Sequence, residues 1–144
     1  MDKTRVLFLC VHNSARSQMA EAYLKQFGGE QFEVESAGLE PGQLNPLAVA
    51  VMREDGIDIS NNPTNDVFEF FKQGKRFHYV ITVCDAGSSA RCPVFPGMTK
   101  KIAWDFPDPS MFTGTREEQL AKTRDVRNNI KTAVKKFVAE IVHP

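Results

Sequence analysis

The chain has 144 residues, and we expect one domain over residues 1–144 with one hydrophobic core. Its 18 basic and 18 acidic residues give a net charge of zero, which argues against nucleic-acid binding through bulk charge. The apolar run after residues 1–5 is too short for an export signal or a membrane span, so we expect a cytoplasmic protein with no membrane partner.

Short apolar runs alternate with amphipathic stretches along the chain. The expected strands are residues 5–9, 32–36, 79–83 and 101–104. The expected helices are residues 17–27, 46–54, 65–72 and 116–142. Strands separated by helices predict an α/β fold, a three-layer sandwich with helices on both faces of a four-stranded parallel sheet. In such sheets ligands bind at the carboxyl ends of the strands.

Residues 10–17 (CVHNSARS) lie between the first expected strand and the first expected helix. A cysteine six residues before an arginine is common by chance. The stronger evidence is that Cys10 and Arg16 lie at a strand-to-helix turn. Backbone N–H groups, the helix N-terminus and the Arg16 guanidinium can together bind a tetrahedral oxyanion. The positive electrostatic field of these groups favours the thiolate form of Cys10, which is the nucleophilic form. The expected oxyanion-binding residues are Val11, His12, Asn13, Ser14, Ala15, Arg16 and Ser17. The alternative is a buried strand-end cysteine and a surface arginine.

A loop with two acids and two prolines, residues 104–109 (WDFPDP), follows the last expected strand. Displacing an oxygen from an oxyanion requires a proton on the leaving group, and a carboxyl group at the same rim could supply it. Asp108 is the candidate general acid because Pro109 restricts its backbone. Asp105 is expected to be structural. The alternative is that Asp108 only begins a turn.

Two further cysteines, Cys84 and Cys92, follow the third expected strand and are separated by seven residues. A loop that brought Cys84 to Cys10, and then Cys92 to Cys84, would pass a disulfide outward by thiol exchange. One alternative is zinc binding, for which the histidines lack finger-like spacing. Another is a core Cys84 with an inert surface Cys92.

Together these motifs resemble the low-molecular-weight protein tyrosine phosphatase fold and, within it, the thioredoxin-coupled arsenate reductases. The matching segments cover nearly the whole chain and are residues 10–23, 36–38, 44–46, 56–60, 83–84, 92–93 and 104–109. The resemblance implies that Cys10 is the nucleophile, Arg16 binds the oxyanion and Asp108 is the general acid. It also implies that Cys84 and Cys92 form a redox relay.

The resemblance implies reduction of arsenate to arsenite, because arsenate has the shape and charge of phosphate and a phosphate-binding loop would hold it. A Cys10 thiol–arsenate adduct would give a Cys10–Cys84 disulfide and then a Cys84–Cys92 disulfide, which thioredoxin would reduce. No cofactor would be required, and we expect a monomer. The main alternative is a phosphatase that hydrolyses aryl phosphates through a Cys10 phosphocysteine. A reductase coupled to a small thiol and an anion-sensing module without turnover are further alternatives.

Some members of that branch bind potassium near the anion loop. The matching oxygen ligands here are Asn13, Glu21, Ser36 and Asp66. The stretches 61–66 and 84–92 are each one residue longer than in other members, which bears on the assignment of Asp66. Ala15 occupies a position where relatives often carry cysteine. We expect no loss of activity, because that position has no required chemical role.

Overall fold

The computed structural model describes residues 3–83, 95 and 97–142, so the predicted relay residues Cys84 and Cys92 lie outside the described residues. The strands are β1 (Thr4–Cys10), β2 (Phe32–Gly38), β3 (Tyr79–Thr82) and β4 (Lys100–Ala103). The helices are α1 (Arg16–Gly28), α2 (Pro46–Glu54), α3 (Val67–Lys72) and α4 (Arg116–Val142), with short 3₁₀ turns η1 (Gly29–Gln31) and η3 (Pro109–Met111).

The four strands form one parallel sheet in the order β2-β1-β3-β4. The chain passes from β1 to β2 on one side and then crosses to β3 on the other, so the strand order reverses at β1. Cys10 is the last residue of β1 and pairs with Gly38 at the end of β2. The predicted parallel sheet is confirmed, and Cys10 lies where such sheets bind ligands.

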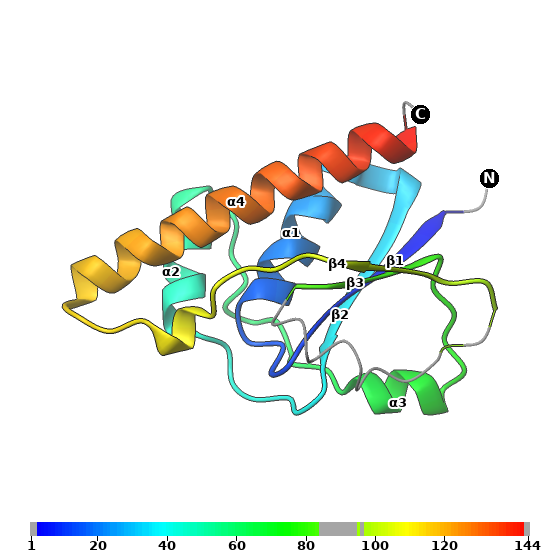
Figure 1. The fold of residues 1–144 in the computed structure, drawn as a ribbon, viewed down its shortest axis with the longest axis horizontal. Helices are drawn as coiled ribbons and strands as arrows, with labels where there is room; N and C mark the ends of the chain where they lie inside the picture. Colours follow the sequence, from blue (N-terminus) through cyan, green and yellow to red (C-terminus); the bar gives the residue numbers. More distant parts are fainter. Residues whose placement is uncertain (1–2, 84–94, 96, 143–144) are drawn as a thin grey trace.

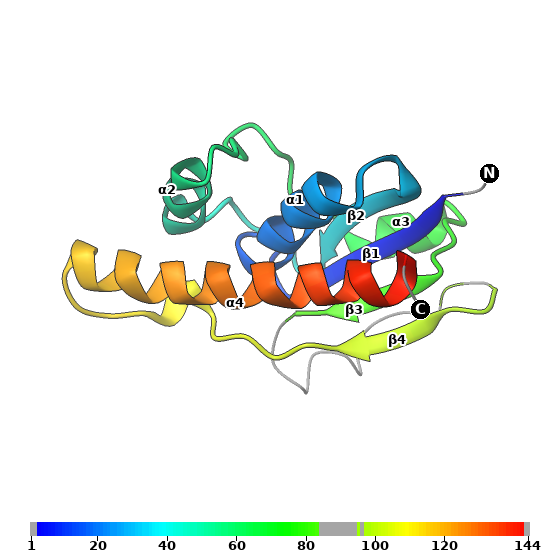
Figure 2. The ribbon, with the colours of Figure 1, turned by 90° about the horizontal axis from the view of Figure 1, so that it is seen from above.

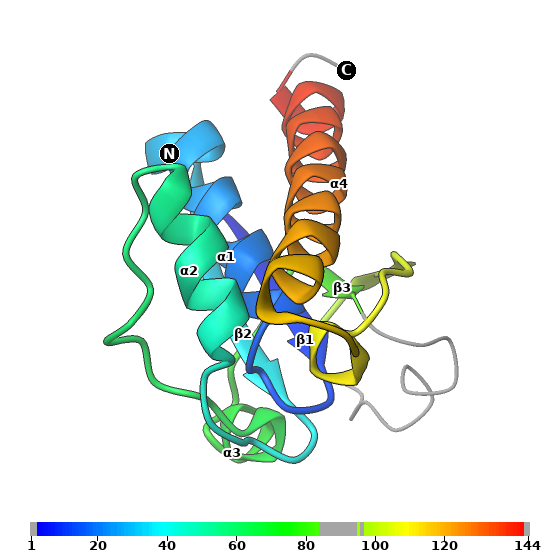
Figure 3. The same ribbon diagram turned by 90° about the vertical axis from the view of Figure 1, so that its left-hand side faces the viewer.

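Helices cover both faces of this sheet. Figure 1 shows α4 and α1 on one side and α3 on the other, and Figure 3 shows α2 beside α1 on the side of α4. Strand β1 is buried on both faces: Val6 and Phe8 join the core under α1 and α4, whereas Leu7 and Leu9 join the core over α3. The predicted three-layer sandwich is therefore confirmed.

Helix α4 lies along the length of the molecule (Figure 2). Its buried residues Val126, Ile130, Val134 and Phe137 recur at helical spacing and pack on the core shared with α1 and α2. In the described part of the chain, no helix has the length and apolarity needed to cross a membrane.

The local sequence explains where two helices begin. The side chain of Asn45 accepts a hydrogen bond from the Leu47 N–H, and Pro46 begins α2, as the sequence predicts. Helix α3 begins at Val67 rather than at residue 65, because the Asp66 carboxylate accepts the Phe68 N–H and acts as the N-cap. The bounds of α2 and α4 match the expected ones, and the remaining element ends match or differ by one or two residues.

Candidate active site

The segment that joins β1 to α1, residues 10–17, is called the anion loop below. Cys10 ends the strand and Arg16 begins the helix. Ala15 occupies the N-cap position and makes no side-chain cap. The first N–H groups of α1 therefore remain available to a ligand, and the positive end of the helix faces the loop.

The carbonyl groups of the anion loop are bonded to the segment that follows β2. The carbonyls of Cys10, Val11, His12 and Ser14 accept hydrogen bonds from the backbone N–H groups of residues 39, 40, 42 and 45 respectively, at 2.7–3.1 Å. Because these carbonyls point outward, successive N–H groups are free to line the inside of the loop. This is the arrangement by which backbone nests bind anions.

The sulfur of Cys10 is buried inside this loop and receives two polar contacts. The Asn13 N–H donates to Sγ at 3.1 Å, and the Ser17 hydroxyl lies 2.9 Å from it. Both groups can donate a hydrogen bond to a thiolate, and hydrogen bonds to a charged acceptor are the stronger kind. These two contacts hold the sulfur at the bottom of the loop.

Asn13 holds the loop in an unusual backbone conformation. Its φ of 53° lies in the left-handed region, and it is fully buried. Its Nδ2 donates to the hydroxyls of Ser17 at 2.8 Å and Ser36 at 2.9 Å, while its Oδ1 accepts from the Asn65 N–H at 2.8 Å. One side chain thus connects the anion loop to α1, to β2 and to the segment before α3.

Gly38 allows β2 to approach the anion loop closely. A Cβ at this position would lie 2.6 Å from the Val11 carbonyl oxygen and 2.8 Å from the Asn13 backbone nitrogen. Any side chain would push these backbone atoms away. The glycine at the end of β2 is therefore part of the architecture of the loop.

Arg16 is buried and reaches the loop that follows β4. Its Nη1 donates to the Phe106 carbonyl at 3.0 Å, and its Nη2 lies 3.4 Å from Asp108 Oδ2. The other carboxylate oxygen, Oδ1, accepts from the backbone N–H and hydroxyl of Ser110 and begins η3. One oxygen of Asp108 thus caps the turn and the other faces the arginine, which brings the two predicted residues to one rim.

The chain leaves β3 beside the anion loop. Thr82 pairs with Leu9, and the Val83 N–H donates to the Leu9 carbonyl at 3.0 Å. Val83 is thus held next to the strand end that carries Cys10. Cys84 follows it in the sequence, and the predicted relay through Cys84 and Cys92 concerns residues outside those described.

Side-chain hydrogen bonds connect only some of the four residues matched to a potassium site. Ser36 donates its hydroxyl to the Glu21 carboxylate and accepts from Asn13, so three of the four are connected. The described bonds of the Asp66 side chain lead to Phe68 instead. In the part of the chain that the structure describes, there is no group of three or more His, Cys, Asp or Glu residues able to hold a metal.

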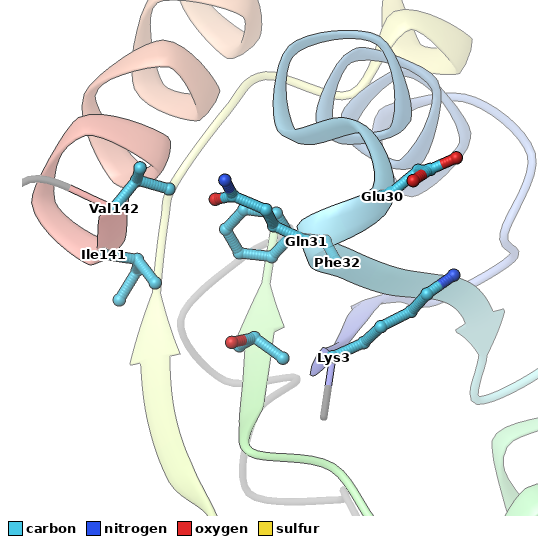
Figure 4. A pocket seen from close by; sticks show the side chains of 7 residues that line it. Lys3, Glu30, Gln31, Phe32, Ile141 and Val142 are labelled. Carbon is cyan, nitrogen blue, oxygen red and sulfur yellow. The ribbon is translucent and has the colours of Figure 1, made fainter. Parts of the chain in front are cut away.

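A separate hollow of about 430 Å³ lies at the opposite end of the sheet (Figure 4). It is lined by Lys3, Thr4, Glu30, Gln31, Phe32, Ile141 and Val142. Thr4 begins β1 and Cys10 ends it, so the length of the strand, about 20 Å, separates this hollow from the sulfur. The hollow is therefore distinct from the anion loop.

Comparison with known sequences agrees with this geometry. The sequence profile of the family described as low molecular weight phosphotyrosine protein phosphatase matches residues 5–143. The chain belongs to this family. The resemblance seen in the sequence motifs is thereby confirmed.

Relatives of this phosphatase-family chain include arsenate reductases. The arsenate reductase of Bacillus subtilis (strain 168) is 41% identical over 137 residues, which is 95% of this chain and 96% of that protein. A solved arsenate reductase in the phosphate-binding state superposes with a TM-score of 0.77 at 32% identity, covering 96% of this chain and 98% of that one.

A thioredoxin-dependent arsenate reductase of Corynebacterium glutamicum superposes with a TM-score of 0.73 at 26% identity. The match covers 99% of this chain and 63% of that one. The family fold thus extends over nearly all of this sequence and is shared with reductases as well as with the phosphatases that gave the family its description.

Sequence reasoning assigned no role to three residues of this family site. Gly38 gives close backbone approach, Asn65 orients the Asn13 amide, and Gln18 contacts the Asn13 carbonyl. Gly38 and Gln18 both lie in segments that match the reductase motifs, and that match could have pointed to a role for them. Asn65 lies in the stretch whose length departs from other members, so its contact could be found only in three dimensions.

Proposed function

We propose that this protein reduces arsenate to arsenite. The observation that carries the proposal is the buried Cys10 sulfur, which lies at the base of an anion loop with inward N–H groups. The arsenate reductases among its relatives support it. Arsenate has the shape and charge of phosphate, so a loop that binds one tetrahedral oxyanion suits the other.

The first step is attack of the Cys10 thiolate on arsenic. The N–H groups of the loop and the Arg16 guanidinium hold the arsenate oxygens. A sulfur–arsenic bond forms and the bond from arsenic to a hydroxyl group of the arsenate breaks, while protonated Asp108 gives its proton to that hydroxyl, which leaves as water. The carboxyl oxygen of Asp108 that faces Arg16 supports this role, because it lies at the same rim as the sulfur.

The second step transfers electrons by thiol exchange. The Cys84 thiolate attacks the Cys10 sulfur, a Cys10–Cys84 disulfide forms, and the electron pair of the sulfur–arsenic bond goes to arsenic, which leaves as arsenite. Cys92 then attacks Cys84, which gives a Cys84–Cys92 disulfide and restores the Cys10 thiolate. The exit of β3 beside Leu9 supports this sequence of steps.

A dithiol of the thioredoxin type would reduce the Cys84–Cys92 disulfide and complete the cycle. The similarity to a thioredoxin-dependent arsenate reductase supports this choice of reductant. We propose further that the protein works as a monomeric single domain over residues 1–144 in the cytoplasm. Size-exclusion chromatography with light scattering tests the monomer.

The side chains of Asn13, Glu21 and Ser36, which match a potassium site, bond to one another and to neighbouring residues in this structure. Asn13 directs its amide nitrogen toward Ser36 because its oxygen accepts from Asn65. The ammonium of Lys25 already pairs with Glu21. None of the steps above uses a resident ion. Potassium dependence remains a prediction of the resemblance, and arsenate turnover in potassium against choline salts tests it.

Disulfide mapping tests the proposal directly. Reduced protein is incubated with arsenate without a reductant, and its peptides are analysed by mass spectrometry, with phosphate as the unreactive control. We expect a Cys84–Cys92 disulfide and an equivalent amount of arsenite with arsenate only. Cys92→Ser should accumulate the Cys10–Cys84 disulfide. Arsenate turnover that survives in Cys84→Ser would contradict the relay.

Hydrolysis of aryl phosphates is the second candidate function, and the family match favours it. It would use the same Cys10, Arg16 and Asp108, with water attacking the phosphocysteine in place of Cys84. Cys84→Ser therefore separates the two activities. We expect it to abolish arsenate reduction and to leave hydrolysis of p-nitrophenyl phosphate unchanged.

A further inference from the structure

Gln18 lies in the first turn of α1, is 1% exposed, and uses its whole amide group inside the protein. Its Nε2 donates to the Asn13 carbonyl at 3.1 Å and to the Pro63 carbonyl at 2.9 Å. Its Oε1 accepts from Asn62 Nδ2 at 3.1 Å. The amide therefore bridges the anion loop and the segment 62–63, which are far apart in sequence.

The contact to Asn13 completes the outward pattern of the loop carbonyls. The carbonyls of Cys10, Val11, His12 and Ser14 are bonded to the segment after β2, whereas that of Asn13 is bonded to Gln18. The left-handed conformation of Asn13 turns its carbonyl toward α1 and its N–H toward the Cys10 sulfur. The Asn13 carbonyl shares one rigid peptide plane with the Ser14 N–H, so holding the carbonyl also fixes the direction of that N–H.

We propose that Gln18 is a positioning residue for oxyanion binding, which fixes the Asn13–Ser14 peptide so that its N–H joins the other loop N–H groups in facing the oxyanion. This role rests on the proposed function, because it concerns the same loop. A purely apolar side chain of similar length would fill the same space. It would leave the carbonyl of the fully buried Asn13 without this donor, and proteins rarely leave a buried carbonyl unpaired.

Gln18→Met is the central test, because methionine keeps the length of the side chain and removes its polar atoms. Inorganic sulfate is the probe, since it is a tetrahedral oxyanion that a thiolate does not reduce. Its dissociation constant is measured by isothermal titration calorimetry, and arsenate KM and kcat are measured with a thioredoxin system. Met19→Leu, a fully buried neighbour in the apolar core, is the matched control.

We expect Gln18→Met to weaken sulfate binding about tenfold, the size of one well-made hydrogen bond. The arsenate KM should rise in parallel, and alkylation of Cys10 by iodoacetamide at neutral pH should slow in a Cys84→Ser/Cys92→Ser background. Met19→Leu should leave sulfate affinity unchanged. A Gln18→Met protein that loses stability but binds sulfate as tightly as wild type would overturn the role.

Asn62→Ala gives a second route if Gln18→Met does not fold. It removes the donor to Gln18 Oε1 and leaves the Nε2 contacts, so we expect a smaller loss of sulfate affinity, about threefold. Unchanged affinity in that variant would then overturn the role. A wild-type protein that neither binds sulfate nor reduces arsenate would instead overturn the proposed function, and this inference with it.

Discussion

Two polar networks in this molecule are organised in opposite ways. In the anion loop, donors from Asn13 and Ser17 converge on one sulfur, and the helix N-terminus behind them has no side-chain cap. The second network, which we call the α2–α4 junction, consists of Tyr23, Glu54, Asp55, Arg124, Arg127 and Lys131. There every charge has a protein partner of opposite sign or a hydrogen-bond donor.

The junction, rather than the loop, contains the titrating groups that are displaced most clearly. Burial and the hydrogen bond to Asp55 raise the pKa of Tyr23, and the same hydrogen bond lowers the pKa of Asp55. The hydrogen bond from Arg124 lowers the pKa of Glu54. Perturbed carboxyl groups often mark active sites, but here they mark a closed structural contact between helices. In this molecule, the hydrogen-bond donors that converge inside the anion loop identify the site better than shifted pKa values do.

The largest expected effect comes from the centre of the anion loop. Cys10→Ser should reduce arsenate turnover by at least about 10⁴-fold, because a hydroxyl at this position is a far weaker nucleophile than a thiolate. Turnover is measured with the thioredoxin system, and the free energy of unfolding is measured by urea denaturation. Residual turnover within about tenfold of wild type would show that Cys10 is not the nucleophile.

Asp108→Asn should lower kcat by about 10²–10⁴-fold, the usual contribution of a general acid. Asparagine retains the oxygen that begins η3 by accepting from Ser110, so the turn should be preserved. The measurement is kcat for arsenate reduction. Asp105→Asn, in the same loop and exposed, is the matched control. Equal losses in the two variants would contradict a specific role for Asp108.

A change in the α2–α4 junction should affect stability and leave chemistry alone. Tyr23→Phe removes the hydroxyl that donates to Asp55 at 2.6 Å and should lower the free energy of unfolding by about 1.5–3 kcal/mol. Urea denaturation checks the loss, and arsenate kcat should stay at the wild-type value. Tyr79→Phe on β3 keeps the same ring chemistry and is the control, for which little change is expected.

The smallest effect is a pH dependence of stability. Because the folded pKa of Asp55 is below its ordinary value, its contribution is present above about pH 4 and is lost as the pH falls through the folded pKa. Asp55→Asn should therefore flatten the stability profile below pH 4. Urea denaturation at pH 5 and pH 3 measures the difference, and an unchanged slope would show that Asp55 is not coupled to folding.

The sequence was informative wherever a pattern was local. The apolar runs predicted four parallel strands, and Asn45 with Pro46 predicted the start of α2, because caps and periodicity act over a few residues. The start of α3 was placed two residues early, since Asp66 could equally be a helical residue or a cap. Single-domain organisation and the cysteine relay stay predictions.

What the sequence determined by itself was the set of reactive groups: a cysteine and an arginine at a strand-to-helix turn, and an aspartate after the last strand. Only the tertiary structure decided how they are held. Gly38 and Asn65 reach the anion loop from segments that local patterns do not connect, and Gln18, next to the loop in sequence, links it to the distant segment 62–63. The reason is physical: a loop N–H points inward only when a partner elsewhere in the fold bonds the carbonyl on its other side.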